Sequence, residues 1–292
     1  MEQATSLQES GIDLHAHTTA SDGSLSPTEL VHKAVAARLA ALAVTDHDTI
    51  GGLAEAQGEA SRVGLDLVTG VELSVEDAGG RFHLLGYLFR SDDGPMQSAL
   101  TQLRTQRAAR NEQIAERIKE LGLPVTMDDV RAEAGDGDVI ARPHFAQALL
   151  KKGVVNSVQD AFDRYLATGK PLYQPKEVLS PADAIAMIHA AGGLAVMAHP
   201  GLVPLSATGL DKRVTELTES AGMDGIEAYY SQHGQADTER FLALAARLNL
   251  LVTGGSDFHG TPKPHVTLGK VYKDRPAPME LLDRMRERVA SR

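Results

Sequence analysis

Apolar runs along the chain alternate with stretches of helical periodicity, which is the pattern of an α/β protein. Two of the predicted helices begin with the same signal, because Ser26 and Ser180 are serines followed at once by a proline, as at many helix N-termini. Seven apolar runs predict strands, at residues 11–15, 42–46, 66–75, 82–88, 194–198, 225–230 and 249–254. The pattern therefore predicts an α/β fold with most strands separated by helices.

Two parts of the chain depart from this alternation. The runs 66–75 and 82–88 are joined by the segment EDAGGR, which predicts a hairpin, so the sheet is not expected to be purely parallel. Between about residue 95 and residue 180 the strand pattern stops and helical stretches follow one another. We expect a core made of residues 1–94 and 181–292, interrupted by a helical insertion at 95–180 that contributes to the substrate pocket.

Composition limits the classes of function. The 29 lysines and arginines against 39 aspartates and glutamates give a formal charge of −10, which disfavours a broad electrostatic surface for long nucleic acid. The absence of cysteine excludes disulfides and thiolate metal sites. The polar opening MEQATSLQES and the lack of a long apolar run predict a cytoplasmic protein that does not contact membranes. No feature of the sequence predicts an obligate protein partner.

Metal-binding side chains follow or lie in nearly every predicted strand. His15 and His17 are two residues apart, so an extended backbone would point both to the same side. The carboxyl ends of strands are where loops converge to build sites in α/β folds. The nine candidate ligands are His15, His17, Asp22, His47, Glu72, His83, His199, Asp257 and His259.

Each of these residues alone could be an ordinary hydrogen-bonded side chain of the core, but their common position favours a metal cluster. Nine ligands are too many for one ion, because a divalent transition metal takes about four to six. The sequence therefore predicts two or three divalent ions that share bridging carboxylates. Mixed oxygen and imidazole ligands suit Mn²⁺ best, with Zn²⁺ or Fe²⁺ as alternatives.

Six separated motifs resemble those of the polymerase-and-histidinol-phosphatase (PHP) family of metal-dependent phosphoesterases, in family order. They are DLHAHTTASDG, ALAVTDHDTIGG, GVELS, FHLLGY, AVMAHPG and GGSDFHG. The resemblance implies a distorted seven-stranded (βα) barrel. Aspartate rather than histidine at position 22 is similar to the branch of nucleoside 3′,5′-bisphosphate phosphatases and 5′-to-3′ exoribonucleases.

The resemblance also implies how the ligands are shared. It assigns His15, His17, Glu72 and Asp257 to a first ion, Glu72, His83 and His199 to a second, and Asp22, His47 and His259 to a third. A metal-bridging hydroxide, available at neutral pH, would attack phosphorus in line while the ions absorb charge on the oxygens. The chain has no cysteine and no G-x-S-x-G elbow, so a protein nucleophile is not expected.

Substrate selection is expected from the insertion. Composition alone would treat Arg142, His144 and Lys170 as surface residues, whereas the resemblance implies that the segments ARPHF and GKP line the pocket. Arg107 and Arg110 lie on one predicted helix, and their spacing is more typical of a solvated face. His233 follows the sixth strand and is a further candidate, as a proton donor to the leaving group or a substrate contact.

These residues leave more than one function open. The first is a phosphatase that removes the 3′-phosphate from nucleoside 3′,5′-bisphosphates, for example converting phosphoadenosine phosphate to AMP. The second is a 5′-to-3′ exonuclease acting on short 5′-phosphorylated oligoribonucleotides. From another class, an amide hydrolase of related fold would use a carboxylated lysine between its metals, and no lysine lies among the strand-end residues. A non-catalytic metal-binding module would be expected to lose ligands, and all nine are present.

Overall fold

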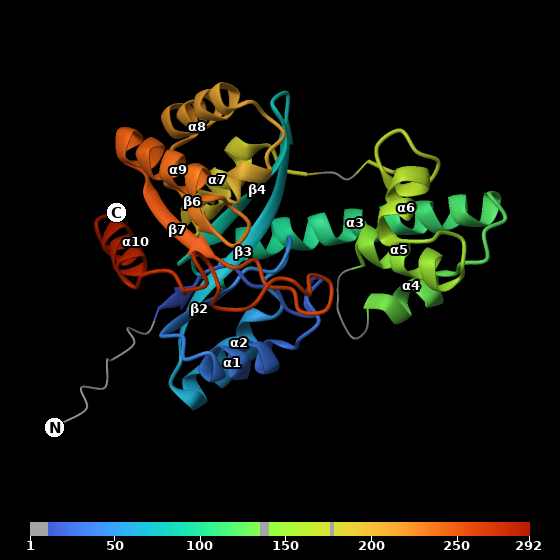
Figure 1. The fold of residues 1–292 in the computed structure, drawn as a ribbon, viewed down its shortest axis with the longest axis horizontal. Coiled ribbons are helices and arrows are strands. Elements are labelled where there is room, and N and C mark those ends of the chain that lie inside the picture. Colours follow the sequence, from blue (N-terminus) through green and yellow to red (C-terminus); the bar gives the residue numbers. More distant parts are fainter. Residues whose placement is uncertain (1–10, 135–139, 176–177) are drawn as a thin grey trace.

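Seven strands form one curved sheet whose spatial order follows the chain. The computed structural model describes residues 11–134, 140–175 and 178–292. The strands are β1 (Ile12–Asp13), β2 (Ala41–Val44), β3 (Asp66–Asp77), β4 (Gly80–Tyr87), β5 (Leu194–Met197), β6 (Gly225–Tyr230) and β7 (Leu251–Gly255). Each falls within or next to one of the seven predicted runs, and Figure 1 shows them surrounded by helices.

The sheet is mixed. Strands β1, β2 and β3 are parallel, β4 is antiparallel to both β3 and β5, and β5, β6 and β7 are parallel again. In the β3–β4 hairpin, Asp77 pairs with Gly80, whose φ of 102° is a conformation that glycine adopts without strain. The predicted hairpin is therefore confirmed.

The two ends of the sheet meet and nearly close it into a barrel. The Leu14 N–H donates to the carbonyl of Gly254 at 3.1 Å, and Ala16 forms a parallel bridge with Phe258. Gly255 allows this approach, because a Cβ at that position would lie 2.1 Å from the Cβ of His15. The expected distorted seven-stranded barrel is confirmed.

Helices cover the outside of the barrel. They are α1 (Pro27–Ala36), α2 (Leu53–Val63), α7 (Pro181–Ala190), α8 (Ala207–Ala221), α9 (Gln235–Leu248) and α10 (Glu280–Ala290), with a short 3₁₀ turn η2 (Pro200–Leu202) after β5. Ser26 and Ser180 cap α1 and α7 as predicted, accepting hydrogen bonds from the backbone N–H groups of Glu29 and Asp183. Apolar side chains between these helices and the strands form most of the core.

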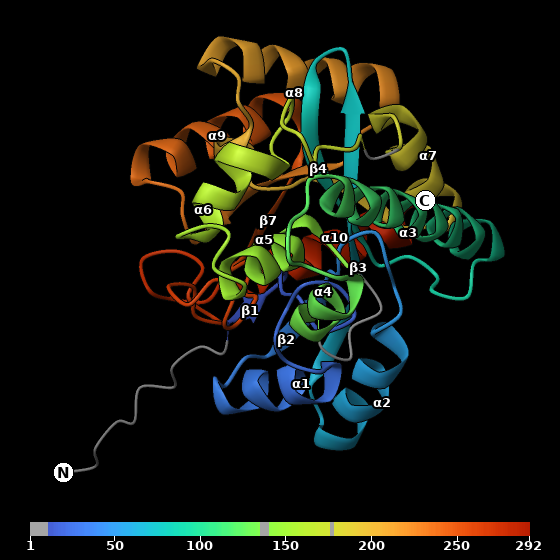
Figure 2. The ribbon, with the colours of Figure 1, turned by 90° about the vertical axis from the view of Figure 1, so that its right-hand side faces the viewer.

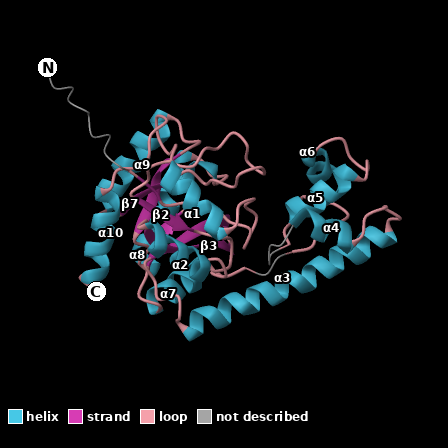
Figure 3. Cartoon of the chain, turned by 90° about the horizontal axis from the view of Figure 1, so that it is seen from below, coloured by secondary structure: helices cyan, strands magenta, loops and turns pink. Residues whose placement is uncertain are grey.

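The stretch between β4 and α7 is helical. It contains α3 (Gly94–Glu120), α4 (Met127–Ala134), α5 (Arg142–Lys151), α6 (Val158–Ala161) and the π-helix η1 (Phe162–Leu166). Figures 1 and 3 show α4, α5 and α6 standing off the barrel at the far end of α3, and Figure 2 views them in front of it. Ile114, Phe145 and Leu149 belong to a separate apolar cluster here. Its boundaries as an insertion at 95–180 stay a prediction.

Among the described residues, none of the helices combines the length and apolar character that crossing a membrane would require.

Candidate metal centre and the adjoining cavity

Glu72 lies at the centre of the predicted cluster. It is 1% exposed and comes from β3. Its Oε2 lies 3.2 Å from His15 Nε2, 3.1 Å from His17 Nε2 and 3.2 Å from His47 Nδ1. Its Oε1 lies 2.7 Å from His83 Nδ1 and 2.9 Å from His199 Nε2. The two oxygens of one carboxylate therefore face two different sets of imidazoles, as a bridging ligand would.

Two further carboxylates complete the cluster from the loops after β1 and β7. Asp257 Oδ1 lies 3.3 Å from His17 Nε2 and 3.6 Å from His15 Nε2. Asp22 Oδ1 lies 3.3 Å from His259 Nε2, and its Oδ2 lies 3.9 Å from His47 Nε2. All nine candidate ligands thus meet at one end of the barrel, brought together from six strands and the loops that follow them.

Three groups of these side chains have ligand atoms within 4.8 Å of one another. The first consists of the four residues that the family resemblance assigns to one ion: His15, His17, Glu72 and Asp257. The second joins His17 to Asp22, His47 and His259, and the third consists of His47, Glu72 and His83. His199 is absent from the third group, although its Nε2 is 3.4 Å from His83 Nδ1. The assignment of ligands to individual ions stays a prediction.

The donor atoms fit a cation. Both ring nitrogens of His17, Nδ1 of His47 and Nδ1 of His199 are buried and have no hydrogen-bond partner. The short distances from His17 Nε2 and His47 Nδ1 to Glu72 therefore lack hydrogen-bond geometry. Burying a polar nitrogen without a hydrogen-bond partner destabilises the folded protein. Divalent ions coordinated by these nitrogens and by the carboxylate oxygens would supply the missing partners.

Because the carboxylates and imidazoles of the cluster are buried close together, they shift one another's pKa values. Burial alone lowers the pKa of His17, but the nearby carboxylates of Asp257 and Glu72 outweigh this effect and raise the pKa to about 9. Burial raises the pKa of Glu72, but the nearby imidazoles outweigh this effect and hold it well below its usual range. Burial dominates at His47 and lowers its pKa to about 3. The site therefore favours ionised carboxylates, which divalent ions need as ligands.

Residues that sequence reasoning missed hold the ligands in place. Glu227 on β6 is fully buried; its Oε1 accepts from His15 Nδ1 at 2.9 Å and its Oε2 from the His199 backbone N–H at 2.7 Å. Tyr230 and Lys263 donate to Asp257 Oδ2 at 2.8 Å and 2.6 Å. The one signal for Glu227 was an acidic residue inside the apolar run GIEAYY. Nothing in the local sequence indicates Tyr230 or Lys263.

A cavity of about 260 Å³ adjoins the cluster and extends to the helical segment. From the barrel side it is lined by Ser21, Asp22, His47, Ser74 and His83, and from the helical side by Arg107, Arg110, Ala141, Arg142, Pro143 and Phe162. Candidate metal ligands and guanidinium groups therefore face one space.

The expectation that Arg107 and Arg110 form a solvated face is wrong. Both side chains are only 7% exposed, because this face of α3 turns toward the barrel and the start of α5. Arg107 forms an ion pair with Asp48, whose Oδ1 also accepts from the Ser74 backbone N–H at 2.8 Å. The helix is thereby tied to the strand that carries Glu72.

The three predicted substrate residues take different positions. Arg142 lines the cavity, and its Nη1 donates to the Leu166 carbonyl at 3.4 Å. His144 is mostly buried and accepts from the Ala141 N–H at 3.1 Å, and burial lowers its pKa. Lys170 is exposed and is not among the residues that line the cavity. Their roles in binding stay predictions.

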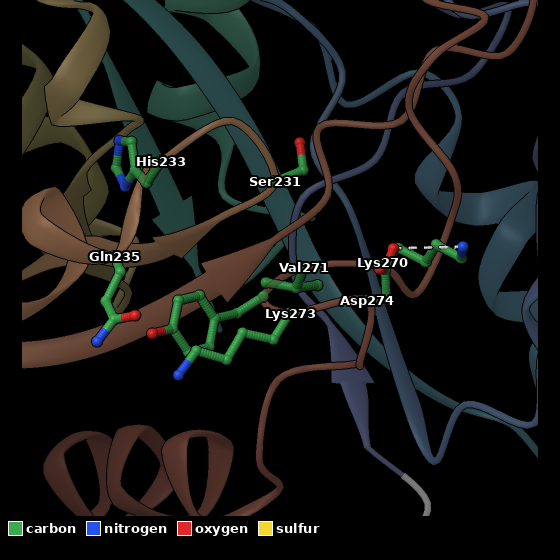
Figure 4. Close-up of a pocket in the computed structure, with 8 residues that line it drawn as sticks. Ser231, His233, Gln235, Lys270, Val271, Lys273 and Asp274 are labelled. Atoms are coloured by element: carbon green, nitrogen blue, oxygen red, sulfur yellow. Dashed lines mark ion pairs between the residues drawn. The ribbon is translucent and has the colours of Figure 1, made fainter.

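His233 lies in a different cavity, of about 250 Å³, beside the loop at Lys270–Asp274 (Figure 4). Its Nδ1 donates to the Ala228 carbonyl at 3.1 Å, and its Nε2 accepts from the Gly201 N–H at 3.1 Å. Burial lowers its pKa, which suits this neutral form. Both ring nitrogens are thus engaged with backbone, so a role in proton transfer stays a prediction that would require one bond to open.

Comparison with known proteins agrees with this geometry. Residues 13–171 match the model of the PHP domain. The chain is 39% identical to the 5′-3′ exoribonuclease Rnm of Escherichia coli (strain K12), covering 88% of each chain. It is 36% identical to a 3′,5′-nucleoside bisphosphate phosphatase of Chromobacterium violaceum, covering 85% of this chain and 87% of that protein. A solved structure of a metal-dependent phosphoesterase from Bifidobacterium adolescentis is similar at a TM-score of 0.83, with 33% identity and 96% of each chain covered.

Proposed function

The chain belongs to the PHP domain family of metal-dependent phosphoesterases, and on that premise we propose that it removes one phosphate from a small nucleotide. The first substrates to test are nucleoside 3′,5′-bisphosphates such as phosphoadenosine phosphate, from which the 3′-phosphate would be removed. The relative from Chromobacterium violaceum is named for this substrate class.

One observation carries the proposal. A single cavity has candidate metal ligands on one wall and three arginines, Arg107, Arg110 and Arg142, on the other. In a nucleotide with phosphates at two positions, one phosphate could lie at the metal ligands while the other binds the arginines. On the same wall as the arginines, Phe162 and Pro143 add apolar surface, which suits the nucleoside.

The nine clustered side chains would hold two or three divalent ions, with Mn²⁺ proposed first and Zn²⁺ or Fe²⁺ as alternatives. Such ions supply a nucleophile at neutral pH by lowering the pKa of water, and they neutralise charge on the phosphoryl oxygens. The protein itself orients the phosphate. Arg142, His144 and Lys170 are proposed to contact substrate, and His233 is kept as a candidate proton donor.

A second function within the same chemistry is 5′-to-3′ exonuclease action on short 5′-phosphorylated oligoribonucleotides. The similarity to exoribonuclease Rnm, at 39% identity over most of both chains, favours it. The amide-hydrolase alternative has less support, because no lysine lies among the strand-end residues and Lys263, which contacts the candidate ligand Asp257, does so as an ion pair. A cytoplasmic location stays a prediction.

The decisive experiment is phosphate or nucleotide release from a panel assayed with added Mn²⁺. The panel contains adenosine 3′,5′-bisphosphate, 3′-AMP, 5′-AMP and a 5′-phosphorylated RNA of about five nucleotides. We expect the bisphosphate to give the highest kcat/KM, with 5′-AMP as its product. Faster release of mononucleotides from the RNA would favour the exonuclease. Silence on the whole panel would overturn both.

A further inference from the structure

A second cavity lies where β6 and β7 end, and it shares no lining residue with the cavity beside the candidate metal ligands. Its volume is about 250 Å³, similar to the 260 Å³ of the first cavity. Ser231 and His233, from the loop after β6, line it together with the segment Lys270–Asp274 (Figure 4). Hydrolysis of a bisphosphate requires only the first cavity, so the second has no assigned ligand.

Tyr230 connects this second cavity to the candidate metal centre. Its hydroxyl donates to Asp257 Oδ2 at 2.8 Å, and its ring centre lies 5.5 Å from that of His199, another candidate ligand. On its other side the Tyr230 ring centre lies 5.0 Å from that of His233, which lines the cavity. One aromatic side chain therefore separates the second cavity from the ligands. The first cavity adjoins the ligands from β1 to β4 and the helical segment, a different part of the barrel rim.

The lining of the second cavity combines an aromatic ring with a positive charge. The ring of Tyr272 packs against Tyr229 with their centres 5.4 Å apart, which fixes its position. Lys270 is paired with Asp274 at 3.3 Å, whereas Lys273 has no ion pair within the described part of the chain and lies with its Nζ 4.9 Å from the centre of the Tyr272 ring. A ring on which a base can stack, next to a cation that can pair with a phosphate, suits a nucleotide.

The turn that carries Lys273 has an unfavourable backbone conformation. Tyr272 and Arg275 form an antiparallel bridge, and the two residues between them, Lys273 and Asp274, have φ of 49° and 59°. Two-residue turns with positive φ at both positions favour Asn and Gly, and lysine is less stable there. Such strained positions cluster at functional sites. The presence of lysine instead of asparagine therefore favours a role for its ammonium group in binding.

We propose that the second cavity binds a nucleotide of an RNA substrate, namely the nucleotide that follows the cleaved bond on its 3′ side. This inference rests on the proposed function in its exonuclease form. The 5′-terminal nucleotide would occupy the first cavity, the bond to be cleaved would lie at the metal ligands, and the chain would continue toward Tyr272 and Lys273. A nucleoside 3′,5′-bisphosphate ends at the phosphate to be cleaved, so it would not reach the second cavity.

The test is Lys273→Asn, assayed on a short 5′-phosphorylated RNA and on adenosine 3′,5′-bisphosphate. Asparagine removes the charge but suits a positive φ, so the variant should be at least as stable as wild type. We expect KM for the RNA to rise about 2- to 5-fold. The dependence of this KM on salt concentration should also weaken, because one contact to a phosphate is lost. For the bisphosphate, kcat/KM should change less than about twofold.

Tyr272→Leu tests the aromatic ring separately. Loss of one stacked base should raise KM for the RNA about 5- to 100-fold, again without an effect on the bisphosphate. Arg38→Asn is the matched control for Lys273→Asn. Arg38 is also an exposed cation with a positive φ, 58°, but it lies just before β2, away from the strand ends that carry the site. It should change neither substrate's kinetics.

The two substrates separate failure of this site from failure of the proposed function. Equal effects of Lys273→Asn on both substrates, or none on the RNA, would overturn the second site, as would a wild type that hydrolyses the bisphosphate but not the RNA. If wild type hydrolyses neither, the proposed function fails, and fluorescence anisotropy of the labelled RNA decides the site. Weaker RNA binding to Lys273→Asn than to Arg38→Asn would support it, and equal or undetectable binding would overturn it. Should Tyr272→Leu not fold, Lys273→Asn carries the test alone.

Discussion

Glu227 accepts two hydrogen bonds that reach separate parts of the candidate metal centre. One comes from the ring of His15 and the other from the backbone of His199, which has an unusual φ of 27°. A carboxylate that receives the second N–H of a ligating histidine fixes the orientation of the ring and raises the basicity of the free nitrogen. Glu227 is therefore a positioning residue for ligands on both sides of Glu72.

Replacing Glu227 by Gln should weaken metal binding without unfolding the protein. An amide offers only one acceptor oxygen, so either His15 or His199 loses its partner. We expect about a 10- to 100-fold loss in Mn²⁺ affinity and in kcat. Manganese titration by calorimetry, alongside phosphate release, measures this. Glu219→Gln, at an exposed position of α8, is the control, and identical Mn²⁺ titrations for the two variants would contradict the role of Glu227.

The histidines could be predicted from sequence and the burial of Arg107 and Arg110 could not, for a physical reason. His15 and His17 follow a short strand, where alternation of side chains already places both on one side. Arg107 and Arg110 are three residues apart on a helix, and that spacing is the same for a buried and a solvated face. What decides burial is the packing of α5 and the barrel against α3, which involves residues far away in the chain.

At the scale of elements, the contact between β1 and β7 both closes the barrel and builds the site. The Asp257 N–H donates to the His15 carbonyl at 2.8 Å, and the His17 N–H donates to the Phe258 carbonyl at 2.9 Å. The first and last strands thus hold the histidine pair and Asp257 in register. The close approach depends on Gly255, which faces the backbone of His15.

Gly255→Ala should separate these strands. The added Cβ would lie 2.5 Å from the nitrogen and 2.1 Å from the Cβ of His15, neither of which can move without shifting the strand. We expect about 1–3 kcal/mol of destabilisation in urea unfolding, typical of overpacking, with a larger proportional loss of activity. Gly58→Ala is the control, since it lies in α2 with open space around it, and it should stabilise the protein by about 0.5–1 kcal/mol. Similar behaviour of the two variants would contradict this account.

The strands themselves were predictable because each buried strand is an apolar run bounded by turn residues. The prediction of β1 as residues 11–15 was longer than the two residues that pair as a strand. The chain leaves the β1–β2 ladder after Asp13 and continues by pairing with β7 and the residues that follow it, which no local pattern reveals. Because this pairing joins residues far apart in the chain, the closed barrel could be predicted from the family resemblance but not from the periodicity of the sequence.

At the scale of the whole molecule, an acidic protein contains a site suited to anions. The formal charge is −10, yet the helical wall of the cavity carries three arginines. The opposite wall contributes the carboxylate of Asp22 and adjoins the buried carboxylate of Glu72, so it becomes attractive to phosphate only when divalent ions neutralise them. Substrate binding and metal binding are therefore expected to depend on one another.

Removal of the metal should abolish activity and lower stability while leaving the protein folded. Carboxylate oxygens of Glu72 and Asp22 already lie 2.7–3.3 Å from nitrogens of the surrounding imidazoles, and the core of the barrel does not depend on an ion. A ligand present at 100 times its dissociation constant stabilises the native state by about 2.7 kcal/mol, so the melting temperature should fall by several degrees on chelation. Circular dichroism with and without a chelator, followed by Mn²⁺ addition, checks both effects. If activity and melting temperature survive exhaustive chelation, the nine side chains do not form a metal centre, and the phosphate must be activated by the arginine wall alone.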